Sequence, residues 1–307
     1  MSFVILPDLV IEEIVKSLSQ KEILFIASLS LRARRRLSRH TKSRGVEIRI
    51  VDDRFDSCVE IISDDQLFYR IKIDTHRGPS NSSWRFKTLI PVWFEKDNLI
   101  SHWRTDDNAF QDILDFLMEI FRIEEVSFEI NLENSCSAVK CLEHCALKNL
   151  KIGLINWKSF IESDEMAKRV MIALKGAPNL KIKGFNSKSF FDNFHLFRVD
   201  QLKIEDAMWM TVENVMALRN CKKVHLEDVS FKTSDISRIF REFKKDPGEM
   251  QELHMDCRNE IRLEEMVKGL YIDEEDKFVR HKIYFNSNGT WFSLSKLRLA
   301  VKIAKEF

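Results

Sequence analysis

The spacing of hydrophobic positions changes along the chain, and each change marks a different kind of element. In the first 44 residues, hydrophobic side chains recur every three or four positions, which is typical of short amphipathic helices. From Gly45 onward, hydrophobic and polar residues alternate, which predicts antiparallel strands over 45–95. We therefore predict a three-helix unit over residues 1–44 and a larger domain of mixed strands and helices over residues 45–307.

The first 44 residues contain the signals of three helices. Pro7 suits the first turn of a helix that runs to about Leu18, because a first-turn residue does not need its backbone N–H. Ser19 and Glu22 have the spacing of a capping box, which predicts the start of a second helix. This second helix is apolar on two faces, so we expect a partner chain to cover one of them. An ordinary three-helix cap on the larger domain is the alternative.

A weak recurrence of strand-like and helix-like segments runs through residues 120–275. Short aliphatic runs follow one another at intervals of roughly 20 to 31 residues, and most are separated by a helix-like stretch. This pattern predicts a curved solenoid like that of leucine-rich repeats, with an open α/β sheet of another topology as the alternative. The aliphatic runs are Val126–Ile130, Leu150–Ile152, Leu180–Ile182, Leu202–Ile204, Val224–Leu226 and Leu253–Met255.

The C-terminal region carries the signal of a β-hairpin over residues 279–295. Asn288 and Gly289 separate two strand-like runs, and this pair readily adopts the positive φ angles that a tight hairpin turn needs. Together, the helical start, the alternating strands, the strand–helix repeats and the hairpin indicate an α+β protein. Its small helical unit precedes an irregular α/β domain like those of leucine-rich repeats.

The N-terminal pattern resembles an F-box, most closely those of nematode F-box proteins. In that family, three helices dock a Skp-type adaptor and so tether the protein to a cullin–RING ubiquitin ligase. The family often has an acidic residue where this chain has Leu9, and a closing Trp where it has arginines. The matching positions are Leu6-Pro7, Ile14, Leu18, Glu22-Ile23 and Ser28-Leu29-Ser30. The resemblance implies that the adaptor is contacted by Leu6, Pro7, Ile14, Leu18, Ile23 and Leu24.

The region from about 120 to 290 is similar to the F-box-associated domain that follows the F-box in many nematode proteins. The similarity rests on the segment around Trp209, the run Lys223–Leu226, the helix at 234–243 and the run Met250–Leu253. That domain is thought to recruit the target protein. The two resemblances together imply a substrate receptor of an SCF-type ubiquitin ligase, without catalytic activity of its own and with a target that the sequence does not identify.

A basic run over residues 32–44 allows a different function. Its arginines and lysines could neutralise several phosphates, so a nucleic-acid-binding module is the alternative to the receptor. However, aromatic residues that would stack on bases are absent from the run. We expect these side chains to form a solvated helix face or to contact the adaptor, and we do not expect nucleic acid among the partners.

Composition and motifs narrow the classes of protein to which the chain can belong. The chain has 307 residues, 44% of them hydrophobic, and a formal net charge of +1, which fits a globular protein with a sizeable core. We expect neither a membrane span nor a secretory signal, and hence a cytoplasmic or nuclear protein with reduced cysteines. Glycine-rich phosphate loops and catalytic motifs are absent, so no catalytic residue and no cofactor are predicted.

One group of residues resembles a metal site at first sight. Cys136, Cys141, His144 and Cys145 are all possible zinc ligands, but they lie within one predicted helical stretch. Zinc modules normally draw pairs of ligands from two separate places in the chain. We therefore interpret these residues as ordinary thiols and an ordinary histidine, and we predict no metal site.

Overall fold

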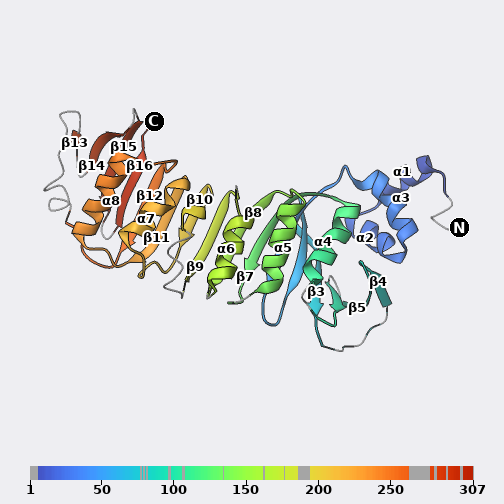
Figure 1. Ribbon diagram of the computed structural model, residues 1–307. Coiled ribbons are helices and arrows are strands. Elements are labelled where there is room, and N and C mark those ends of the chain that lie inside the picture. The colour runs from blue at the N-terminus through green and yellow to red at the C-terminus, as the bar shows by residue number, and fades with distance from the viewer. Residues whose placement is uncertain are drawn as a thin grey trace. The chain divides into compact units, whose positions relative to one another are not determined.

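The computed structural model shows a chain of two compact units, Met1–Ile155 and Asn156–Phe307. Figure 1 shows the helices and strands of both units. Strand β8 (Ile152–Ile161) crosses the boundary between them. None of the helices in the described residues is long and apolar enough to cross a membrane. The structure describes residues 6–76, 78, 80, 82–95, 98–105, 108–133, 135–161, 163–175, 177–185, 194–262, 277–279, 282–287, 290–297 and 300–306.

The first unit begins with the three predicted helices. They are α1 (Asp8–Ser17), α2 (Gln20–Leu29) and α3 (Leu31–Thr41). The capping box is confirmed, because the backbone N–H of Glu22 donates to Ser19 Oγ at 3.3 Å and the backbone N–H of Ser19 donates to Glu22 Oε2 at 2.8 Å. These two bonds satisfy amide groups that the start of α2 would otherwise leave without partners.

The strands of the first unit start at Gly45, as the change of hydrophobic spacing predicts. Their order is β7-β1-β2-β3-β6-β5-β4, in which β1, β2 and β3 pair antiparallel, β7 pairs parallel to β1, and β6 pairs parallel to β3. Helices α4 (Ala109–Ile120) and α5 (Cys136–Leu147) pack on β1, β2 and β7. The strands are β1 (Gly45–Asp52), β2 (Cys58–Ser63), β3 (Gln66–Asp74), β4 (Ser82–Arg85), β5 (Leu89–Glu95), β6 (Asn98–His102) and β7 (Arg122–Ile130).

Much of the apolar surface of helix α2 is covered by its own chain. Ile23 and Leu24 are fully buried, and Phe25 on another face joins an aromatic cluster from β3, β4 and β5. The ring centroid of Phe25 lies 5.1 Å from that of Phe94 and 5.7 Å from that of Trp84. The chain itself therefore covers Ile23, Leu24 and Phe25, the part of this helix for which a partner chain was expected. The strands that follow the helical unit supply the missing surface.

A buried arginine connects three parts of the first unit. The side chain of Arg34, on α3, is only 2% exposed, and its guanidinium forms an ion pair with Glu119 of α4 at 3.0 Å. The same group donates hydrogen bonds to the backbone carbonyls of Ala27 and Arg85, and it stacks over the ring of Phe116 at 4.4 Å. Since Arg85 belongs to β4, these contacts attach the helical unit to the sheet and to α4.

The second unit contains the predicted strand–helix repeats. Strands β9, β10, β11 and β12 follow one another in the sheet in chain order, and each pairs parallel to the next. The predicted aliphatic runs from Leu180 to Met255 all lie within these strands. Residues 263–275 of the predicted repeat region lie outside the described residues. The elements are α6 (Asp164–Ala173), β9 (Asn179–Phe185), β10 (Gln201–Ile204), α7 (Val212–Ala217), β11 (Lys223–Val229), α8 (Thr233–Lys245) and β12 (Glu252–Cys257).

The C-terminal strands complete the sheet of the second unit. The predicted hairpin is confirmed by the antiparallel pairing of β14 (Lys282–Ser287) with β15 (Thr290–Leu297), although its Asn-Gly turn lies outside the described residues. Strand β13 (Lys277–Val279) pairs with β14 on the other side. The last strand, β16 (Ala300–Lys305), was not predicted; it lies antiparallel between β12 and β15 and so joins the hairpin to the parallel strands.

Replacing Arg34 should destabilise the first unit more than any ordinary surface change. In Arg34→Ala, two carbonyls lose their donor and a cavity opens beside Phe116, so we expect the free energy of unfolding to fall by about 3 kcal/mol. Urea denaturation monitored by circular dichroism measures this change. The matched control is Arg35→Ala, because Arg35 is exposed on the same helix; its expected cost is below about 0.5 kcal/mol. Equal stability of the two variants would contradict the structural role of Arg34.

Candidate functional site

Among the described residues, the parallel strands of the second unit have one buried face and one partly exposed face, which we call the uncovered face. Val224 and Leu226 on β11, like Leu253 and Met255 on β12, are buried, whereas the residues between them are partly exposed. Side chains on the uncovered face therefore line up across neighbouring strands. The register places His225 opposite His254. In the same way, Lys203 of β10 lies opposite His225, and Lys302 of β16 lies opposite His254.

Ion pairs repeat along this face with the same geometry. In each pair, a basic residue of one strand contacts an acidic residue one pleat further along the next strand. Lys181 Nζ lies 2.7 Å from Glu205 Oε1, and Lys203 Nζ lies 2.7 Å from Glu227 Oε1. At the third step the pair is a histidine with an aspartate. We call the residues Lys181, Lys203, Glu205, His225, Glu227, His254 and Asp256 the polar ladder.

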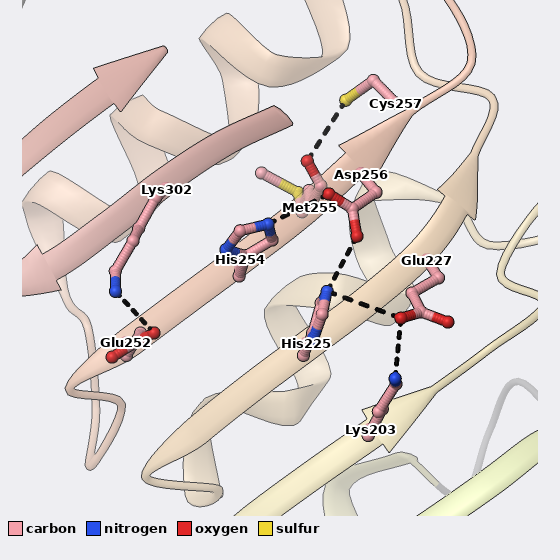
Figure 2. A network of polar contacts seen from close by, with 9 residues as sticks. All are labelled: Lys203, His225, Glu227, Glu252, His254, Met255, Asp256, Cys257 and Lys302. Carbon is pink, nitrogen blue, oxygen red and sulfur yellow. Dashed lines mark hydrogen bonds and ion pairs between the residues drawn. The ribbon is translucent and has the colours of Figure 1, made fainter. Parts of the chain in front are cut away.

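Two histidines converge on one carboxylate at the end of the ladder. His225 Nε2 lies 2.8 Å from Asp256 Oδ2, and His254 Nε2 lies 3.0 Å from Asp256 Oδ1 (Figure 2). The centroids of the two imidazole rings are 4.5 Å apart. Partial burial disfavours ionisation of Asp256, but the hydrogen bonds from His225 and His254 outweigh it and lower the pKa of this carboxyl. The three side chains, which we call the His–Asp cluster, could therefore offer nitrogen and anionic oxygen ligands to a metal ion.

The polar ladder was not predicted from the sequence, although a local signal for it exists. Three successive strands carry the pattern basic–aliphatic–acidic, at residues 203–205, 225–227 and 254–256. The prediction of repeats used only the aliphatic positions of these runs. The polar residues between them repeat with the same period and could have indicated a shared surface. The order of the strands in the sheet, however, depends on the whole fold and cannot be predicted from any one of these three segments.

The structure separates the predicted adaptor-contacting residues into two groups. Pro7 is exposed, and Leu6, Ile14 and Leu18 are partly exposed. By contrast, Ile23 and Leu24 have no exposed surface, so they cannot touch a partner in this conformation. Other hydrophobic side chains are exposed in their place on the same helices. These are Leu9 at 77%, Val10 at 42%, Leu29 at 79% and Leu31 at 40%.

Much of the basic run over residues 32–44 is used within the fold. Arg34 is buried, and Arg36 pairs with Asp8 at 2.5 Å. Arg44 donates to the carbonyls of Leu18 and Val15 at 2.7 and 2.6 Å, which supplies a side-chain donor to carbonyls at the end of α1. Lys42 likewise contacts the carbonyl of Met118. These contacts connect α1, α3 and α4. Because the side chains are used in this way, they are not all available to bind phosphates.

The segment that contains Cys136, Cys141, His144 and Cys145 forms a single helix, α5, as predicted. Cys141 and Cys145 are buried, whereas Cys136 is exposed. His144 Nε2 contacts Asp115 Oδ1 at 2.7 Å. A hydrogen bond with Cys145 and burial raise the pKa of the Cys141 thiol. The ligand atoms of these four residues are not gathered in one place within the described structure.

Comparison with known proteins shows a similarity to a nematode protein. The chain is 25% identical over 156 residues to the Skn-1 dependent zygotic transcript 15 protein of Caenorhabditis elegans. The matched region covers 48% of this chain and 45% of that relative. The chain thus matches less than half of the length of this curated relative. No protein-family model matches the sequence, and no solved structure matches it. The similarity therefore links the chain to a nematode protein without defining an F-box.

Thiol reactivity should distinguish Cys136 from the other cysteines. Cys58, Cys141, Cys145, Cys221 and Cys257 are buried, and burial raises the pKa of Cys58 to about 12 and that of Cys221 to about 11. Because the thiolate is the reactive form, a thiol reagent should label one cysteine per native chain quickly. Mass spectrometry of the labelled protein identifies the position, and Cys136→Ser should abolish the fast phase. Fast labelling of several cysteines in the native protein would contradict the buried positions.

Proposed function

We propose that the protein is a substrate receptor of an SCF-type ubiquitin ligase. In this role, the three N-terminal helices bind a Skp-type adaptor, and the second unit binds a target protein. The proposal rests first on the resemblance of residues 6–30 to an F-box, together with the three-helix arrangement of α1, α2 and α3. The nematode origin of the matched relative is consistent with the nematode-type F-box pattern.

The observation that carries the adaptor proposal is the exposed hydrophobic surface on these helices. Leu9 and Leu29 each expose more than three quarters of their side chains, next to Val10 and Leu31 in the sequence. Exposed hydrophobic side chains of this kind lose contact with water when a partner binds, which favours association. We define this set, with Pro7, as the outer helix residues. They replace Ile23 and Leu24 in the proposed contact, because those two are buried.

The polar ladder is the proposed target-binding surface. Its side chains are partly exposed and lie on neighbouring strands of one sheet or directly after them, so they can present a defined pattern of charges to a partner. Since Lys203 and Glu227 already pair with each other, the ladder has little excess charge of either sign. We therefore expect a target surface with both acidic and basic groups, bound through an arrangement of complementary charges.

The proposed mechanism requires no chemistry from this chain. A receptor that binds the adaptor and the target at the same time holds target lysines close to the ubiquitin-charged enzyme, so a bimolecular encounter becomes an intramolecular one. The alternative of nucleic-acid binding is not favoured, because Arg34, Arg36 and Arg44 are held by internal contacts.

Adaptor binding should depend on the outer helix residues. We expect the purified chain to form a complex with a Skp-type adaptor, and the double variant Leu9→Asp with Leu29→Asp to weaken it at least about tenfold, because two exposed hydrophobic contacts become charged. Biolayer interferometry with immobilised adaptor measures the affinity. Since both side chains are exposed, the variant should retain the unfolding transition of the native chain.

The matched control is Leu147→Asp, which places the same charge on a leucine that is 81% exposed at the end of α5. This variant should bind the adaptor as tightly as the unmodified chain. Failure of the unmodified chain to bind any Skp-type adaptor would refute the proposed function. Equal binding by the double variant would refute the outer helix residues as the contact.

A further inference from the structure

We propose that His225, His254 and Asp256 form a binding site for a divalent transition-metal ion, with Zn²⁺ as the best-fitting ion. This inference goes beyond the proposed receptor function and does not depend on it. The site lies on the uncovered face of the second unit, at the end of the polar ladder on β11 and β12 (Figure 2).

The ligand atoms are already gathered in one place. One ligand atom from each of the three residues lies within 4.8 Å of the other two, among the residues that the structure describes. Tetrahedral Zn²⁺ holds nitrogen and oxygen ligands at about 2.0–2.2 Å, which places those ligands about 3.3 Å from one another. The contacts of Asp256 with His225 and His254, at 2.8 and 3.0 Å, are close to that separation. Small side-chain rotations would therefore suffice to admit the ion.

The backbone register fixes this arrangement. His225 and His254 are directly opposite each other on parallel strands, so their side chains leave the sheet side by side. Asp256 lies two residues after His254 on the same face of β12, so its carboxylate reaches both imidazoles. Because the three residues belong to two paired strands, the site does not depend on an ordered loop.

The residue types distinguish this position from the rest of the ladder. At the two preceding steps, a lysine satisfies the acidic partner, as in Lys181 with Glu205 and Lys203 with Glu227. Lysine would serve equally well for ion pairing at the third step. Two imidazoles and a carboxylate instead form a set of ligands that Zn²⁺ prefers.

Neighbouring groups define what else the ion would meet. Glu227 Oε1 lies 3.9 Å from His225 Nε2 but is held by Lys203, and Glu252 is held by Lys302 at 2.8 Å. Cys257 is buried on the opposite face of β12, so it is not a ligand. The three residues leave a coordination position for water, or for an acidic or histidine side chain of a bound protein.

Metal titration of the purified full chain tests the site without any partner. All proteins carry Cys136→Ser, which removes the exposed thiol as a competing ligand. Isothermal titration calorimetry with ZnCl₂ should show one ion bound per chain. Co²⁺ in place of Zn²⁺ should give the visible absorption of a tetrahedral site. His225→Gln and His254→Gln should each weaken Zn²⁺ binding at least about 100-fold, because loss of a ligand exceeds the cost of losing a supporting hydrogen bond.

The matched control is His144→Gln, which removes a histidine that also contacts an aspartate, Asp115, but belongs to no cluster of three possible ligands among the described residues. Its Zn²⁺ affinity should stay within about twofold of the parent, since a lone histidine–aspartate pair offers too few ligands. Glutamine at 225 or 254 can still donate to Asp256, so the fold should survive, and thermal unfolding checks this. Absence of Zn²⁺ binding to the parent, or unchanged affinity in both His→Gln variants, would overturn the site.

Discussion

In the described part of the second unit, each parallel strand packs one face into the core and so buries only every second side chain. Val224 and Leu226, for example, are buried, and the intervening His225 is left on the uncovered face. Because the strands are in register, such residues form rows, and half-buried charges in a row need partners of opposite sign. The polar ladder and the His–Asp cluster both follow from this constraint.

A different constraint governs the helices of the first unit. The guanidinium of Arg34 is buried, and its hydrogen-bond and ion-pair partners come from α2, β4 and α4. Helix α3 can therefore bury this charged group only while it is packed against the strands. The aromatic contacts of Phe25 fix α2 in the same way. The inner surfaces of the helices are thus used by the chain itself. Only their outer surfaces, which include Leu9 and Leu29, remain for a partner.

Local features of the fold were predictable, and long-range ones were not. The capping box at Ser19, the strand that starts at Gly45 and the aliphatic runs of β9 to β12 depend on spacing within a few residues. The burial of Ile23 and the position of β16 depend on segments far away in the sequence. His225 and Asp256 are 31 residues apart, and only the pairing of β11 with β12 brings them together.

Amide hydrogen–deuterium exchange of the chain, alone and with a Skp-type adaptor, tests the central claim most directly. The account predicts slower exchange in residues 8–41, where the adaptor would cover the outer helix residues, and unchanged exchange in β9 to β12, which remain free for a target. Unchanged exchange throughout residues 8–41 in the presence of saturating adaptor would contradict it. Protection confined to the polar ladder would place adaptor binding on the second unit and would also contradict the proposed adaptor contact.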